Sequence, residues 1–362
     1  ASSARAAALA AAAWASRGRG PSIKESAPAQ VRIASSPRAE LQRWLAHARD
    51  RHQLLGNDAD EACTTPPQVT YVPGELEVAW IAESRTWKGG ASPPKEVMCS
   101  RMIRHVWATA RWVAHVEGHA AADDVMSTIS VRDGCGKKPQ EVRQIEPLFG
   151  ALRHPSYPYD RKLGSDAMWH VLAAAPKGRG RRFLFDIGAG NKDQPKHDLF
   201  SLRHLTHEYW RQRKVRFDAI FAWEPADVPG LQKLLSELDP HSLGALVWIP
   251  AAATPEAGSP SNPLTWVKKL TEPEDLVVVK LDTNDFKGEM ELADQVASDP
   301  ELAARIDDLF YEHHVWGNDA TNDGWWQRLQ EQNVTHNGNM LYNSFHMFTN
   351  LREKGVGAHS WI

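Results

Sequence analysis

The feature that most constrains the fold is a series of short apolar runs that begins at residue 182 and alternates with helical stretches. Apolar runs occupy 182–187, 217–223, 245–249, 276–281, 309–315 and 356–361. Helices are expected around 196–214, 230–238, 290–296, 300–306 and 344–354, the last ending at Gly355. Strands that alternate with helices predict an α/β fold, with a doubly wound, mainly parallel sheet. Continuous apolar strands fit a sheet that helices cover on both faces.

The chain before this series lacks the alternation. A helix is expected over 38–55, a strand at 69–72 and a buried helix over 99–117, where apolar residues recur at near-helical spacing. We therefore expect 37–180 to form a mostly helical N-terminal extension that packs on an α/β domain of residues 181–362.

The first residues have the character of a targeting signal. Residues 1–24 contain four basic residues and no acid, and 6–15 is almost pure alanine. This composition fits an organelle transit peptide, a secretory signal with a cleavage site near Ala13–Ala15, or an alanine-rich tail without structure. Residues 16–36 are rich in Ser, Pro, Gly and Arg, as in a linker. We expect 1–36 to be a targeting segment and linker, and the protein to lie in a mitochondrion, a plastid or the secretory pathway, not in the cytosol.

Composition excludes several classes of protein. The formal net charge is -3, which argues against a polyanion binder, so no nucleic-acid partner is expected. No run of about 18 apolar residues exists, so no transmembrane helix is expected in this chain. The three cysteines form no CxxC pair, which excludes a zinc site of several cysteines. We expect three ordinary thiols, although one bridge could form in an oxidising compartment.

Acidic residues end the predicted strands. Asp186, Glu224, Asp282 and Glu312 all fall at or near strand carboxyl ends, where ligands bind to open α/β sheets. Glycines after the first strand would let a ligand approach backbone amides. A carboxylate after the second strand can accept hydrogen bonds from both hydroxyls of a ribose. Together these features predict a pocket for a nucleoside cofactor.

Five motifs resemble those of a known family. They are FDIGAG at 185–190, WEP at 223–225, VKLD at 279–282, EHH at 312–314 and LREKG at 351–355. On these motifs the chain resembles the FkbM-like class I S-adenosylmethionine-dependent methyltransferases, over roughly half its length. The loop after Asp282 is longer than the family's, so the family's second acid corresponds to Asp285 or Glu289.

The resemblance implies a cofactor and a reaction. Asp186, Gly188 and Gly190 would cradle the amino-acid part of S-adenosylmethionine, and Glu224 would hold its ribose. Asp282 would face the sulfonium and the acceptor. Members of the family mainly methylate hydroxyl oxygens, so O-methylation of a small molecule or glycan is expected. The candidate catalytic residues are Asp282, Glu289 and His313, with His314 as a further candidate base.

Other interpretations stay open. Gly188 and Gly190 could form only a tight turn, Glu224 could cap a helix, and the histidines could be buried core residues. Asp282, Glu312 and a histidine could bind a divalent metal, but no tight ligand spacing supports this and no metal is expected.

The protein could also be a catalytically degenerate methyltransferase fold that serves as a binding or structural subunit of a larger complex. A nicotinamide-dependent oxidoreductase fits less well, because Lys192 replaces the third glycine and Glu224 lies 34 positions after Gly190, where the usual spacing is about 20.

One loop is a candidate for contact with the acceptor. The stretch 327–339 is polar and contains a glycosylation acceptor at Asn333. With Trp325 and Trp326 before it, and His336 within it, it has side chains suited to stacking on a sugar-like acceptor.

Overall fold

The structure is a computed structural model of the chain. It describes residues 32–54, 67–84, 126–132, 134–135, 141–146, 148, 180–189, 200–225, 235, 238–315, 330–332 and 341–361. Several predictions fall outside these residues: the targeting segment up to residue 31, the helix over 99–117, most of the helix over 230–238, and most of the loop 327–339 with its tryptophans.

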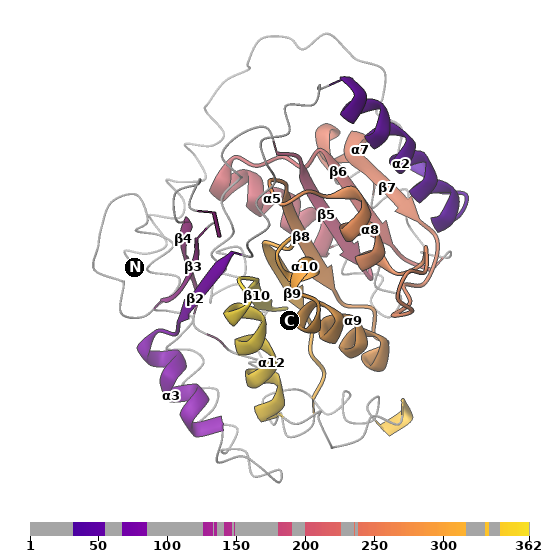
Figure 1. Ribbon diagram of the computed structural model, residues 1–362. Coiled ribbons are helices and arrows are strands. Elements are labelled where there is room, and N and C mark those ends of the chain that lie inside the picture. The colour runs from indigo at the N-terminus through magenta and orange to yellow at the C-terminus, as the bar shows by residue number, and fades with distance from the viewer. Residues whose placement is uncertain are drawn as a thin grey trace, which may run out of the picture. The chain divides into compact units, whose positions relative to one another are not determined.

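The described chain is built around a seven-stranded sheet (Figure 1). Its strands are β1 (Arg32–Ile33), β5 (Arg182–Ile187), β6 (Ala219–Trp223), β7 (Leu246–Ile249), β8 (Leu276–Leu281), β9 (Asp308–Tyr311) and β10 (Gly357–Ser360), in the spatial order β1-β7-β6-β5-β8-β9-β10. All six pairings are parallel. Counted from β5, the last six strands follow the 3-2-1-4-5-6 order of doubly wound sheets. The predicted α/β class is confirmed, and β5 and β8 are neighbouring parallel strands.

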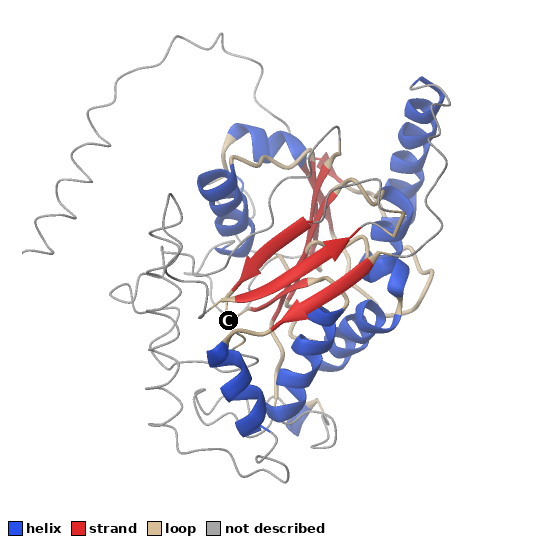
Figure 2. Ribbon diagram, turned by 60° about the vertical axis from the view of Figure 1, so that its left-hand side comes forward, coloured by secondary structure: helices blue, strands red, loops and turns tan. Residues whose placement is uncertain are grey.

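Helices cover both faces of this sheet (Figure 2). They are α5 (Phe200–Arg213), α7 (Pro240–Ala245), α8 (Pro263–Leu270), α9 (Phe286–Ser298), α10 (Pro300–Ala303) and α12 (Leu341–Glu353). Strand residues alternate between two apolar clusters, because successive side chains point to opposite faces. Phe183, Phe185 and Ile187 belong to the cluster shared with α8, α9 and α12, and Leu184 belongs to the cluster shared with α5.

Local sequence sets where the helices begin and end. Asp239, Asn262 and Asp299 each accept a backbone hydrogen bond at a helix start and are followed by proline, which suits the first helical position. Gly355, with a φ of 93°, follows α12 as predicted. The strand expected over 309–315 stops at Tyr311, so the residues after it lie outside the sheet.

The N-terminal extension contains more strand than expected. The helix α2 (Pro37–Leu54) lies against α8, and α3 (Glu75–Ser84) lies against α12. Between these two helices in sequence and after α3, a three-stranded antiparallel sheet is formed by β2 (Gln68–Val72), β3 (Ser127–Arg132) and β4 (Glu141–Ile145). Only β2 was predicted, because β3 and β4 each contain just two apolar residues. The expectation of a mostly helical extension therefore missed this sheet.

Two further features differ from expectation. Arg32 and Ile33, inside the predicted linker 16–36, pair with β7 as an edge strand. Cys135 is disulfide-bonded, and the other two cysteines of the chain lie outside the described residues, so the expectation of three free thiols is wrong. Among the described helices none has the length and apolar character needed to cross a membrane.

Candidate functional site

The carboxyl ends of four neighbouring strands bring predicted site residues into line. The last paired residues of these strands are in register. The residues that follow them form what we call the carboxyl-end row: Glu224, Gly188, Asp282 and Glu312, across β6, β5, β8 and β9. Each row residue donates its N–H to the carbonyl of the last residue of a neighbouring strand, at 3.0 or 3.1 Å. Four adjacent strands span roughly 14 Å, which is enough to accommodate a nucleoside along the row.

Gly188 allows the two central loops to approach one another. Its φ is 84°, in the left-handed region that side chains disfavour. A Cβ built on Gly188 would lie 1.7 Å from the carbonyl oxygen of Asp282. The backbone after β5 therefore touches the backbone after β8, and only glycine fits at this point.

Lys280 contacts both of these loops through its buried side chain. Its side chain is 1% exposed, and Nζ donates to the carbonyl of Gly188 at 2.6 Å. Nζ also lies 3.1 Å from Asp282 and 3.5 Å from Asp186. Burial lowers the pKa of Lys280, but the two carboxylates more than offset this and the net shift is upward, so the side chain is a cation. Sequence reasoning missed this residue, although a lysine inside the run 276–281 was a visible signal.

The two acids beside Lys280 differ in exposure. Asp186 is fully buried and accepts a hydrogen bond from Ser201 of α5 at 3.1 Å. Burial raises the pKa of Asp186, and Lys280 partly counteracts that shift. Asp282 is 20% exposed at the side chain. Asp186 thus joins β5, α5 and β8 from within, whereas Asp282 is the acid of this pair that is open to a ligand.

Glu289 is the buried acid of the loop after β8. One oxygen, Oε1, accepts from the N–H groups of Thr283 and Asn284 at 2.5 and 2.7 Å. The other, Oε2, is buried and accepts no hydrogen bond in the structure. Burial raises the pKa of Glu289 to about 7. Asp285, the alternative second acid, instead caps α9 by accepting from the N–H of Gly288.

The two histidines after β9 have different neighbours. His314 Nε2 lies 4.0 Å from Glu289 Oε2 and 3.4 Å from Glu312, and its ring stacks on Phe286 with centroids 3.9 Å apart. The ring of His313 stacks on Tyr311, and neither of its nitrogens has a hydrogen-bond partner. Burial, together with the neighbouring His314, lowers the pKa of His313 to about 3, so it is neutral. The structure brings His314, not His313, to Glu289.

The remaining predicted site residues are Glu224, Gly190 and the side chains in and before the loop 327–339. Glu224 is 4% exposed and holds its place in the row. Gly190 lies outside the described residues, as do Trp325, Trp326 and His336. Within the described chain no group of three or more His, Cys, Asp or Glu side chains could hold a metal ion.

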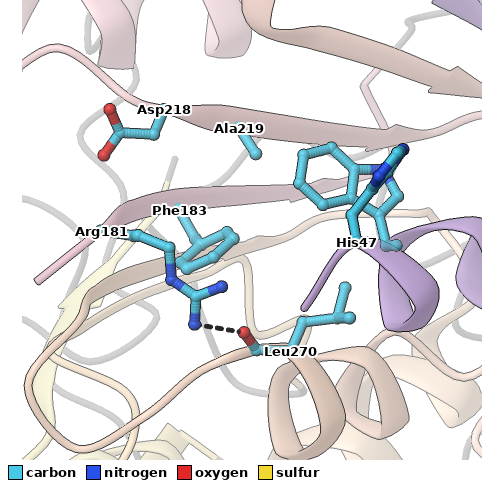
Figure 3. A pocket seen from close by; sticks show the side chains of 7 residues that line it. His47, Arg181, Phe183, Asp218, Ala219 and Leu270 are labelled. Carbon is cyan, nitrogen blue, oxygen red and sulfur yellow. Dashed lines mark hydrogen bonds between the residues drawn. The ribbon is translucent and has the colours of Figure 1, made fainter. Parts of the chain in front are cut away.

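A small cavity lies at the opposite, amino-terminal ends of β5 and β6 (Figure 3). Trp44 and His47 of α2, Arg181, Phe183 and Leu270 are among its lining residues. Arg181 Nη2 donates to the carbonyl of Leu270 at 2.7 Å across it. Its volume of about 50 Å³ can hold a few water molecules but not a nucleoside. The cavity therefore adds nothing to the carboxyl-end row.

No family model, no curated protein and no solved structure matched this chain.

Proposed function

We propose that the carboxyl-end row binds S-adenosylmethionine and that the protein methylates a hydroxyl oxygen of a small molecule or glycan, on a Rossmann-like methyltransferase fold. The observation that carries the proposal is the row itself, with Gly188 at its centre. Gly188 carries no side chain of its own, so the loop backbone can approach a ligand there. The row lies at the carboxyl ends of the strands, at the β5/β8 switch point, which is where doubly wound sheets bind their ligands.

The charges of the site suit this cofactor. Among the described residues, five acids lie in or beside the row, with the buried cation Lys280 between two of them: Asp186, Glu224, Asp282, Glu289 and Glu312. An excess of carboxylates favours a cationic ligand. When bound, S-adenosylmethionine supplies an electrophilic methyl group on a positively charged sulfur. Glu224 would hold the ribose hydroxyls, and Asp282 would face the cationic centre.

Glu289 is the best candidate for the base. Its Oε2 has no hydrogen-bond partner, and its pKa of about 7 lies in the range in which a base accepts a proton at neutral pH. His314, beside it, would stabilise the carboxylate form. Glu289 would then accept the proton of the acceptor hydroxyl while the hydroxyl oxygen is methylated.

Calorimetric titration of the full chain with S-adenosylmethionine and with its demethylated product tests the cofactor assignment. Glu224→Gln should weaken binding by about ten- to a hundredfold, because a charge-assisted hydrogen bond contributes about 1.5–3 kcal/mol. Glu256→Gln removes an exposed carboxylate elsewhere and should leave the affinity unchanged.

The same titration separates the alternatives. No binding of either form to the wild type would contradict the proposal and favour a degenerate binding subunit. Binding of NAD in place of S-adenosylmethionine would favour an oxidoreductase, since the 3-2-1-4-5-6 strand order is also that of dinucleotide-binding sheets.

We also propose that residues 1–36 direct the protein out of the cytosol. The bridged Cys135 supports an oxidising compartment, in which disulfides persist. Fusion of residues 1–36 to a fluorescent reporter tests this, and a diffuse cytosolic signal would contradict it.

A further inference from the structure

A second, chemically distinct groove lies between α5 and the start of α7. It has a volume of about 200 Å³. Phe217 and Leu238 are its buried apolar lining, whereas Arg203, His207, Trp210 and Arg216 line it with exposed side chains. Phe217 precedes β6, so the groove lies at the amino end of that strand. A five-residue strand is roughly 16 Å long, which separates the groove from the carboxyl-end row.

Arg216 is held in place by aromatic stacking. Its Cζ lies 4.3 Å from the centroid of the Trp210 ring, and Nζ of Lys214 lies 5.5 Å from the same centroid. The turn that allows this is fixed: Lys214 has a φ of 56°, and its N–H and that of Val215 donate back to α5. A guanidinium that stacks through its face keeps its in-plane N–H groups free for a planar or tetrahedral oxyanion.

No side chain of the described residues forms an ion pair or hydrogen bond with the Arg216 guanidinium. The acid that lines the groove is Asp239, which interacts electrostatically with Arg216. Its oxygens accept from the N–H groups of His241 and Ser242 and from the hydroxyl of Ser242. The groove thus combines the stacked guanidinium of Arg216 with one carboxylate that also caps a helix. Trp210, 42% exposed, is also the most prominent exposed aromatic side chain of the described chain.

We propose that this groove binds a phosphate or sulfate ester on a small ring-containing ligand. Arg216 binds the oxyanion, and the apolar lining receives the ring. The volume is below the roughly 300–1,000 Å³ of drug-sized sites, so the groove accommodates one ring with one oxyanion. The proposal does not depend on S-adenosylmethionine binding, because the two sites share no residue.

Titration of the full chain with glucose 6-phosphate, glucose 6-sulfate and glucose tests the site. Both esters should bind and glucose should not. Arg216→Gln should weaken binding of the esters by tenfold or more, and Arg216→Lys should weaken it partly, because lysine keeps the charge but not the fork. Arg38→Gln, which removes an exposed arginine of α2, is the matched control and should have no effect.

The results with the two esters show which kind of ester the groove binds. Binding of the phosphate but not of the sulfate would assign the site to phosphorylated ligands, and the reverse result to sulfated ones. Binding of neither ester, or equal weakening by Arg216→Gln and Arg38→Gln, would overturn the proposal. A single-stranded oligonucleotide that binds more tightly than both esters would overturn it in favour of a nucleic-acid surface. Thermal unfolding of Arg216→Gln checks that the variant folds.

Discussion

At the residue scale, three side chains decide what the carboxyl-end row can do. Gly188 brings two loops together, Lys280 neutralises part of their negative charge, and Glu289 keeps one unpartnered oxygen. The contacts of each of these three residues can be removed by a single substitution. The effect of each substitution can be measured as a change in the free energy of unfolding, which requires no knowledge of the acceptor.

Gly188→Ala should destabilise the protein strongly. A non-glycine residue at positive φ costs about 1–3 kcal/mol, and the added Cβ would also collide with the Asp282 carbonyl. Gly258→Ala is the matched control, because its φ is 78° but nothing lies within 4 Å of the added Cβ. Urea unfolding should show a clearly larger loss for Gly188→Ala, and equal losses would contradict the close approach of the two loops.

The titration of Glu289 should make stability fall as pH rises. Its pKa is about 7 in the folded protein and ordinarily 4.5, so the folded state binds more protons between those values. The free energy of unfolding should therefore decrease by roughly 3 kcal/mol between about pH 4.5 and pH 7. Glu289→Gln should lack this contribution.

The test is the difference between the two pH profiles. Asp307, whose pKa is also raised to about 7 by burial, is present in both proteins and cancels in that difference. Parallel profiles for wild type and variant would contradict the burial of Glu289.

At the element scale, the start of α9 separates two acids that the sequence left equivalent. Asp285 begins the helix by capping it, and Glu289 lies one turn later, with its side chain turned back to the loop after β8. The two carboxylates therefore have different partners: Asp285 accepts from the N–H of Gly288 within the helix, whereas Glu289 accepts from the N–H groups of Thr283 and Asn284 before it. Stability and ligand binding should therefore respond to different substitutions.

Asp285→Ala should lower the free energy of unfolding by about 1 kcal/mol, the usual cost of a lost N-cap. The affinity for S-adenosylmethionine and any methyl transfer should be unchanged. Glu289→Gln should show the reverse pattern, with methyl transfer lost and the fold kept. Calorimetry measures the cofactor affinity and the stability of both variants, and a methyl-transfer assay measures their activity. A loss of activity in Asp285→Ala at unchanged stability would reassign the second acid.

At the scale of the whole described chain, a buried polar cluster joins the three-stranded sheet to the end of the main sheet. Arg352 of α12 donates to Glu77 of α3 at 2.9 Å and to the carbonyl of Ala358. His359 of β10 lies 2.7 Å from Glu146, just after β4, and 3.4 Å from Asp308 at the start of β9. Breaking one partner of a buried charge pair costs more than a surface pair contributes, so this cluster fixes how the two sheets pack.

His359 should make that packing sensitive to alkaline pH. Burial lowers its pKa, but Glu146 and Asp308 outweigh this and raise it to about 9, against an ordinary 6.5. The stabilisation should be complete below about pH 6.5 and lost as pH rises through about 9, a change of roughly 3 kcal/mol.

His359→Gln should be less stable than the wild type at pH 6, and its stability should fall less than that of the wild type between pH 6 and pH 9. Glu289 and Asp307 contribute the same decrease to both proteins and cancel in the comparison. Urea unfolding across this range measures both profiles. An equal decrease in both proteins would show that His359 is not the charged partner of the two acids.

The sequence by itself determined the α/β class, the positions of the main strands and the acids that end them. It could do so because these signals are local: apolar runs buried on both faces, proline after a capping residue, and a glycine after the last helix. Most of the candidate site followed, since parallel strands necessarily place their carboxyl ends at one edge.

Only the tertiary structure decided which of these residues meet. Lys280 lies within an apolar run, and nothing in its neighbours along the chain shows that it reaches Asp186, 94 positions earlier. His314 rather than His313 meets Glu289, and because the strand ends at Tyr311, the alternation of a strand could not show which of the two would do so. The sheet of β2, β3 and β4 and the Arg216 groove depend on contacts between segments far apart in sequence, and such contacts leave no periodic pattern along the chain.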